Sequence, residues 1–154
     1  MAALSDYLES GLLHHLFRED SFAKPSQISI ALTSAAPVDS DTGATISEIP
    51  SGLNGSGTGY TRIVLGAPAD SGNDKWSYDE ADAAVGSGVI KNASSHAFDT
   101  ALVDWGWVSG VAICDNATYG AGNLLIHAQL DNPRVVYTGD SLKFDTETFQ
   151  LSFK

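Results

Sequence analysis

The feature that most constrains the fold of this chain is a series of short segments in its second half with alternating apolar and polar residues. In Phe149-Gln150-Leu151-Ser152-Phe153, every second residue is apolar. Successive side chains of a strand point to opposite faces, so this pattern predicts a strand with one buried face. Such segments are separated by sequences that favour turns: Tyr119-Gly120-Ala121-Gly122, Asp131-Asn132-Pro133 and Thr138-Gly139-Asp140.

Strands at this spacing, with no further helical pattern, predict a mainly β fold, an antiparallel β-sandwich or jelly-roll-like domain. A short strand is also expected around Trp76 and Tyr78. In the segment at 105–114, alternation would place Trp105 and Trp107 on one face, as core anchors or, as the less favoured alternative, as interface residues. The predicted strands are residues 28–33, 60–65, 89–92, 97–99, 105–114, 123–130, 134–137, 141–144 and 149–153.

Residues 1–20 form a different pattern, because leucines recur there at every fourth position. This spacing draws one apolar stripe and predicts an amphipathic N-terminal helix. A helix this short is marginal alone, so the stripe must pack either on the domain's own sheet or on a neighbouring subunit. The sequence leaves both partners open. The stripe consists of Leu4, Leu8, Leu12 and Leu16, with Tyr7 beside it.

The rest of the chain, residues 25–154, is expected to form a single β-rich domain with long loops at 34–58 and 67–88. Loops of this length in a compact domain are usually functional or mobile. Both the helix and the first loop carry apolar residues outside the strands, and we expect them to contact other proteins. The candidate interface residues are Leu4, Tyr7, Leu8, Leu12, Leu16, Ile46, Ile49 and Leu53.

Composition excludes several kinds of partner. Lys and Arg total 8 against 19 Asp and Glu, a formal net charge of −11 that repels the phosphates of nucleic acid. No apolar run approaches the roughly 20 residues of a membrane helix, and the N-terminus does not resemble a secretory signal. We therefore expect synthesis in the cytosol. Cys114, in an apolar run, is expected to be a core residue.

No arrangement of residues predicts catalysis, a cofactor or a metal site. His14 and His15 are adjacent and would point about 100° apart on a helix, so they cannot hold one metal ion from one face. The acidic loop from Asp39 to Glu48 lacks the glycine and glutamate positions of a calcium loop. Asp99 and Asp104 would form a glycosidase pair only with a suitable separation and a raised pKa. We expect a protein that is not an enzyme.

Several motifs resemble a family of small structural proteins of tailed-phage virions. They include Gly59-Tyr60-Thr61-Arg62, Trp105-Gly106-Trp107-Val108, Ile113-Cys114-Asp115, Gly122-Asn123-Leu124-Leu125 and Gly139-Asp140. Members are described as tail-fibre-like or minor capsid proteins, and the chain is similar to cyanophage capsid cement proteins.

This resemblance implies a capsid decoration (cement) protein, a homotrimer that binds the major capsid protein on the capsid exterior. The alternative is a tail or tail-fibre component that takes part in host attachment. In that case it would bind a host glycan through exposed aromatic residues such as Tyr60, Trp76 and Tyr119.

Overall fold

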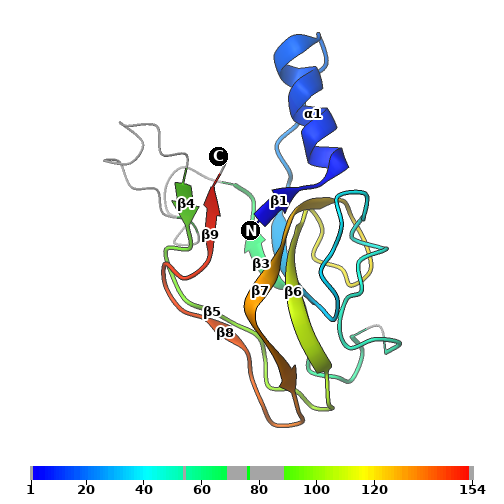
Figure 1. Ribbon diagram of the computed structural model, residues 1–154, viewed down its shortest axis with the longest axis vertical. Helices are drawn as coiled ribbons and strands as arrows, with labels where there is room; N and C mark the ends of the chain where they lie inside the picture. Colours follow the sequence, from blue (N-terminus) through cyan, green and yellow to red (C-terminus); the bar gives the residue numbers. More distant parts are fainter. Residues whose placement is uncertain (1, 54, 69–75, 77–88, 153–154) are drawn as a thin grey trace.

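The computed structural model describes residues 2–53, 55–68, 76 and 89–152 of the 154-residue chain. Its centre is a five-stranded sheet with the order β1-β7-β6-β2-β3, in which every pair of strands is antiparallel (Figure 1). The predicted mainly β, antiparallel fold with an N-terminal helix is confirmed. The five strands are β1 (Ala2–Leu4), β2 (Ile28–Thr33), β3 (Ile63–Gly66), β6 (Gly106–Cys114) and β7 (Leu124–Val136).

Two small sheets lie beside the large one. β4 (Val89–Lys91) pairs with β9 (Gln150–Ser152), and β5 (His96–Ala97) pairs with β8 (Lys143–Phe144). Helix α1 (Asp6–Phe17) extends from one end of the molecule, whereas the paired ends of β6 and β7 form the other end (Figure 1). Within the described residues, no helix has the length and hydropathy needed to cross a membrane.

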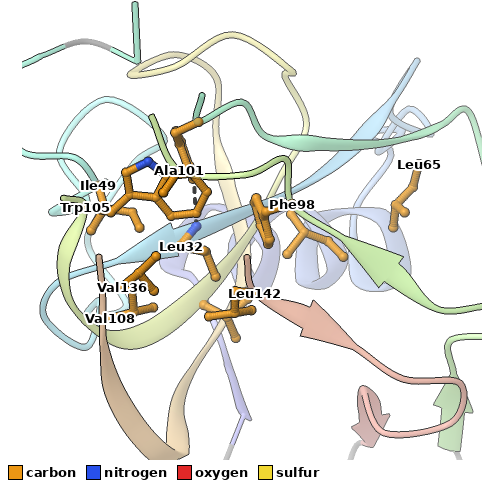
Figure 2. Close-up of a cluster of buried hydrophobic side chains, with 12 residues drawn as sticks. Leu32, Ile49, Leu65, Phe98, Ala101, Trp105, Val108, Val136 and Leu142 are labelled. Atoms are coloured by element: carbon orange, nitrogen blue, oxygen red, sulfur yellow. Dashed lines mark hydrogen bonds between the residues drawn. The ribbon is translucent and has the colours of Figure 1, made fainter. Parts of the chain in front are cut away.

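The main core lies between the large sheet and the segments that form the small sheets. Side chains of β2, β6 and β7, including Leu32, Val108 and Val136, meet Phe98 and Leu142 there (Figure 2). Tyr60 lies in this core, stacked on Phe98 with ring centroids 5.7 Å apart. The buried residues of this core are Ile30, Leu32, Ile49, Tyr60, Leu65, Phe98, Ala101, Trp105, Val108, Val111, Val136 and Leu142.

The opposite face of the sheet is covered by the loop at 34–58. Ile46 from this loop packs on Ala31, Ala112, Cys114 and Leu124 in a second, smaller core. β2 is therefore buried on both faces from Ser29 to Thr33, whereas the alternation of Ile28, Ile30 and Leu32 with Ser29 and Ala31 predicts one buried face. The small residues Ser29 and Ala31 sit on the face that the loop covers, which explains why that face looked solvent-exposed in the sequence.

The N-terminus differs from the predicted helix over 1–20. Ala2–Leu4 forms a strand on the edge of the large sheet, with Leu4 opposite Ile126, and α1 begins only at Asp6. Ser5 separates the two elements, because its backbone is extended and its hydroxyl accepts a hydrogen bond from the Leu8 N–H at 3.2 Å. This is an N-cap, which favours a helix start at that point over one four residues earlier.

The predicted turn at Asp131-Asn132-Pro133 does not separate two strands. β7 continues from Leu124 to Val136, but its pairing with β6 shifts register: Val108 lies opposite Arg134, and Gly110 lies opposite Gln129. The residues between these two pairs, 130–133, form an outward bulge that we call the β7 bulge. Proline has no N–H to give to a ladder, so a bulge accommodates Pro133 within a strand.

The two tryptophans do not share a face. Trp105 is buried at 3% exposure, whereas Trp107 is 54% exposed. Gly106 between them has a φ of 81°, a left-handed conformation that breaks the alternation of an extended strand. The prediction of two core anchors is therefore wrong for Trp107.

The remaining predicted strands occur within a few residues of their expected positions. The predicted loop at 67–88 and the short strand around Trp76 and Tyr78 lie outside the described residues, except for 67, 68 and Trp76. The division into a helical segment and one β-rich domain stays a prediction.

Candidate interaction surfaces

Helix α1 is fixed to the body at its base. The N–H of Ser5 donates to the Leu125 carbonyl of β7 at 3.0 Å, and the N–H of Asp6 donates to the Asp39 carbonyl of the loop at 2.8 Å. Asp39 also holds β7 through a 3.0 Å contact between its carboxylate and Nε2 of His127. The start of the helix, the long loop and β7 therefore meet at one point.

Beyond this base, α1 projects into solvent, and none of its residues is buried. Leu13, Leu16 and Phe17 are 56%, 68% and 79% exposed. The other side of the helix is partly covered by the chain that returns toward β2, where the Phe22 ring meets Tyr7 with centroids 5.9 Å apart. A cluster of apolar side chains at the tip of a projecting helix is typical of a contact with another protein.

The predicted interface residues of the N-terminal segment differ in how far they are exposed. Leu4 belongs to β1, and Leu8 and Leu12 are half-buried, so Tyr7 and Leu16 are the exposed members of the stripe. The prediction missed Leu13 and Phe17, which form a second row four residues apart along the helix. A search for two neighbouring rows would have found them.

The three loop residues of the predicted interface also differ. Ile46 and Ile49 are buried, at 6% and 0% exposure, and their packing in the two cores accounts for their apolar character without any partner. Leu53 is 50% exposed and remains on the surface.

The loop at 34–58 is held in place by a buried ion pair that sequence reasoning missed. Arg62, just before β3, donates from Nη2 to Oε2 of Glu48 at 2.7 Å and from Nε to Oε1 at 2.8 Å. Its remaining hydrogen bonds go to the carbonyls of Gly43, Asn116 and Ala121 at 2.8–2.9 Å. One guanidinium therefore ties the long loop to the loop at 115–122.

Two tyrosines complete the surroundings of Glu48. The Tyr60 hydroxyl donates to Oε1 of Glu48 at 3.0 Å and accepts from the Leu32 N–H at 2.9 Å. The Tyr119 hydroxyl donates to the Glu48 carbonyl at 2.9 Å. Burial, followed by the nearby Glu48 charge, raises the pKa of Tyr60 well above its usual value. The Gly59-Tyr60-Thr61-Arg62 motif therefore has a structural role, because the Tyr60 hydroxyl and the Arg62 guanidinium are buried, whereas Thr61 is exposed.

The other groups considered for chemistry also have structural roles. Burial raises the pKa of Cys114 to about 11, so the thiol stays protonated at neutral pH and is a weak nucleophile. Hydrogen bonds from the N–H and hydroxyl of Thr138 lower the pKa of the exposed Asp104 carboxyl, the opposite of what a general acid needs. Among the described residues, no three His, Cys, Asp or Glu side chains are grouped as a metal site.

The aromatic residues predicted to bind a glycan do not form one exposed surface. Tyr60 is in the core at 1% exposure, and Tyr119 is held against the long loop. Trp76 packs on Phe149, with ring centroids 6.0 Å apart. The structure therefore contradicts the predicted exposure of Tyr60, whereas Trp76 and Tyr119 are half-buried and their part in glycan binding stays a prediction. Trp107 and Tyr137 are the large aromatic side chains exposed at the β6–β7 end, at 54% and 58%.

Comparison with protein-family models gives a match over residues 3–152, nearly the whole described chain. The matching model describes a phage fibre protein, so the chain is a structural component of a phage virion. It belongs to the family described as Podophage GP4 fiber I protein gp80. No curated protein matches the chain.

The family corrects the main functional prediction. A capsid decoration (cement) role on the capsid exterior is wrong, because the matched family is one of fibre proteins. The predicted membership in a family of phage virion structural proteins is confirmed. Scaffold motifs such as Gly139-Asp140 form turns and cores, so they identify the fold family without showing whether a member belongs to the head or the tail.

Proposed function

We propose that this chain is a tail-fibre component that takes part in host attachment, with a structural rather than a catalytic role. The observation that carries this proposal is the match to a fibre family over residues 3–152. The geometry supports it, because the buried polar groups of Glu48 and Arg62 bind each other and hold loops in place. A fibre component also needs contacts at its two ends, and the molecule presents apolar residues at both.

We further propose that α1 is the contact between copies of the chain, in a homotrimer. A helix of 12 residues is marginal in water unless its apolar residues pack on something. The domain's own sheet does not cover Leu13, Leu16 and Phe17. Association through α1 would bury these three side chains, and each is worth roughly 1.5–3 kcal/mol when fully buried.

Labelling intact virions with an antibody against this chain tests the fibre role. We expect gold particles at one pole of the particle, on the fibres, and reduced adsorption to host cells when the antibody is present. Label distributed over the whole head would overturn the proposal. Label at the pole without any effect on adsorption would restrict the role to fibre assembly and contradict its part in host attachment.

A further inference from the structure

The β7 bulge places polar side chains along the edge of the large sheet. On β6 one residue separates Val108 from Gly110, whereas on β7 the residues 130–133 separate their partners Arg134 and Gln129. β1 pairs with β7 only at residues 126–128, so no described strand covers the edge of β7 at the bulge. Bulges of this kind are frequent where a protein aims side chains at a ligand.

An open cavity of about 390 Å³ lies between this bulge and β8. This volume falls within the range of small-molecule sites, roughly 300–1,000 Å³. Asp131 and Asn132 line it from the bulge, Arg134 lines it from the next position of β7, and Lys143 and Phe144 line it from β8. β7 and β8 are consecutive strands, joined by residues 137–142, and lie on facing sides of this space (Figure 1).

The cavity has polar groups that can bind a ligand and an aromatic wall. The guanidinium of Arg134 forms no ion pair with another described residue. Phe144 is half-buried and is held by an edge contact with Phe149, at a centroid distance of 5.5 Å. Lys143 is paired with Asp145 at 2.7 Å, so its charge is already compensated.

These groups match the two chemistries of a sugar ring. Planar carboxylate, amide and guanidinium groups can each form paired hydrogen bonds with neighbouring hydroxyls. The C–H face of a sugar ring packs on apolar walls such as Phe144. Asp131 faces the same cavity as Arg134, and the chain carries a net charge of −11, so a polyanionic ligand would be repelled.

We propose that the cavity between the β7 bulge and β8 binds a neutral sugar unit of a host-surface glycan. This inference rests on the proposed role in host attachment and assigns it to Asn132, Arg134 and Phe144. It places the glycan contact at residues other than the predicted Tyr60, Trp76 and Tyr119.

The test is binding of the full chain to an array of neutral hexose and hexosamine oligosaccharides, together with uronate- and phosphate-bearing ones. The variants are Asn132→Ala and Arg134→Ala, both exposed in the free protein. Arg18→Ala, an exposed arginine at the end of α1, is the matched control. We expect binding to neutral glycans that is weakened about tenfold or more in the two variants and unchanged in the control.

Three results would overturn the inference: no glycan bound by the wild-type chain, binding unaffected by both variants, or a preference for anionic glycans that salt removes. The virion labelling distinguishes this failure from failure of the fibre role. Label at the fibre pole with no glycan binding rejects the cavity alone, whereas label on the head rejects the fibre role itself.

Discussion

At the scale of single residues, the Glu48–Arg62 pair decides where the long loop lies. Both side chains are at most 2% exposed, and both charges are matched by hydrogen bonds. Removing one partner leaves the other as an uncompensated buried charge, which typically costs about 3–5 kcal/mol. Replacing both partners by apolar residues of similar volume costs less, because no charge is then stranded.

We therefore expect Glu48→Leu and Arg62→Met each to lower the free energy of unfolding by about 3–5 kcal/mol. The double variant should lose less than the sum of the two. Urea unfolding of the four proteins measures this cycle. Asp145→Asn breaks the exposed pair with Lys143 and serves as a control, with an expected loss below about 1 kcal/mol. Additive losses in the cycle would mean that the two residues act independently.

Cys114 gives a prediction about pH. Burial raises the pKa of its thiol from 9.0 to about 11, so between these values the folded chain retains a proton that the unfolded chain releases. The contribution of the protonated thiol to the free energy of unfolding is therefore complete below pH 9 and decreases as pH rises toward about 11. Stability should decline over this window by on the order of 2 kcal/mol.

Urea unfolding at several pH values measures this decline, with Cys114→Ala as the comparison. The variant should show a shallower decline between pH 9 and pH 10, where the buried Tyr60 contributes little because an unfolded tyrosine has a pKa of 10.0 and the decline due to Tyr60 lies mostly above that pH. Equal slopes for the two proteins in this range would show that the thiol does not titrate as its burial requires.

At the scale of elements, two glycines of β6 are required for different reasons. Gly106 has a φ of 81° with open space where a Cβ would lie, so the cost of an added methyl group is conformational. At Gly110 an added Cβ would lie 2.5 Å from the Thr33 hydroxyl oxygen and 3.3 Å from the Ala128 carbonyl oxygen. There the cost is steric, because the strands on both sides approach too closely.

Gly106→Ala should therefore lower the free energy of unfolding by about 1–2 kcal/mol, the cost of a left-handed conformation for a residue with a side chain. Gly110→Ala should lose more, since backbone and a buried side chain must both shift. Thermal unfolding of both variants provides the comparison, and an exposed change such as Ser10→Ala in α1 sets the baseline. A Gly106→Ala protein as stable as the wild type would contradict the conformation assigned to Gly106.

The elements also show how far the sequence alone could predict this fold. The alternation in Phe149 to Phe153 and the turn at Gly139-Asp140 are local features, so the strands they predict were found nearly in place. The β7 bulge and the burial of Tyr60 depend on contacts between distant segments, which no local pattern contains. Pro133 was interpreted as a turn residue because a bulge inside a continuous strand gives the same local signal.

The candidate surfaces also combine features that local sequence predicts with features that depend on the fold. The helix and the exposed Leu16 could be predicted, because helical spacing is visible in the sequence, whereas the exposed Leu13 and Phe17 fall outside the predicted stripe. Arg62 could not be recognised as the centre of a buried network, since an arginine in a strand-like segment is usually exposed. The cavity beside the β7 bulge lies between residues near 132 and residues near 143, on consecutive strands, and its shape depends on the bulge and on the path of the chain from β7 to β8, which no local pattern contains.

At the scale of the whole molecule, the projecting helix separates folding from assembly. No residue of α1 is buried, so charged substitutions at its tip should leave the β domain intact. We expect Leu13→Glu and Phe17→Glu to convert the proposed trimer into a monomer with an unchanged β-sheet signal in circular dichroism. Light scattering coupled to size-exclusion chromatography measures the mass of each species.

The matched control for this experiment is Ser10→Glu, which adds the same charge at an exposed position of the same helix. If charge alone caused dissociation, this variant would also be monomeric, and the apolar tip would not be the contact. A wild-type chain that is monomeric at high concentration would remove α1 as a contact between copies.

Three copies joined at α1 would also present three glycan cavities, and such multivalency increases avidity well beyond the affinity of one weak site. Monomeric variants should therefore bind a densely coated glycan surface far more weakly than the trimer, while binding a single soluble oligosaccharide equally well.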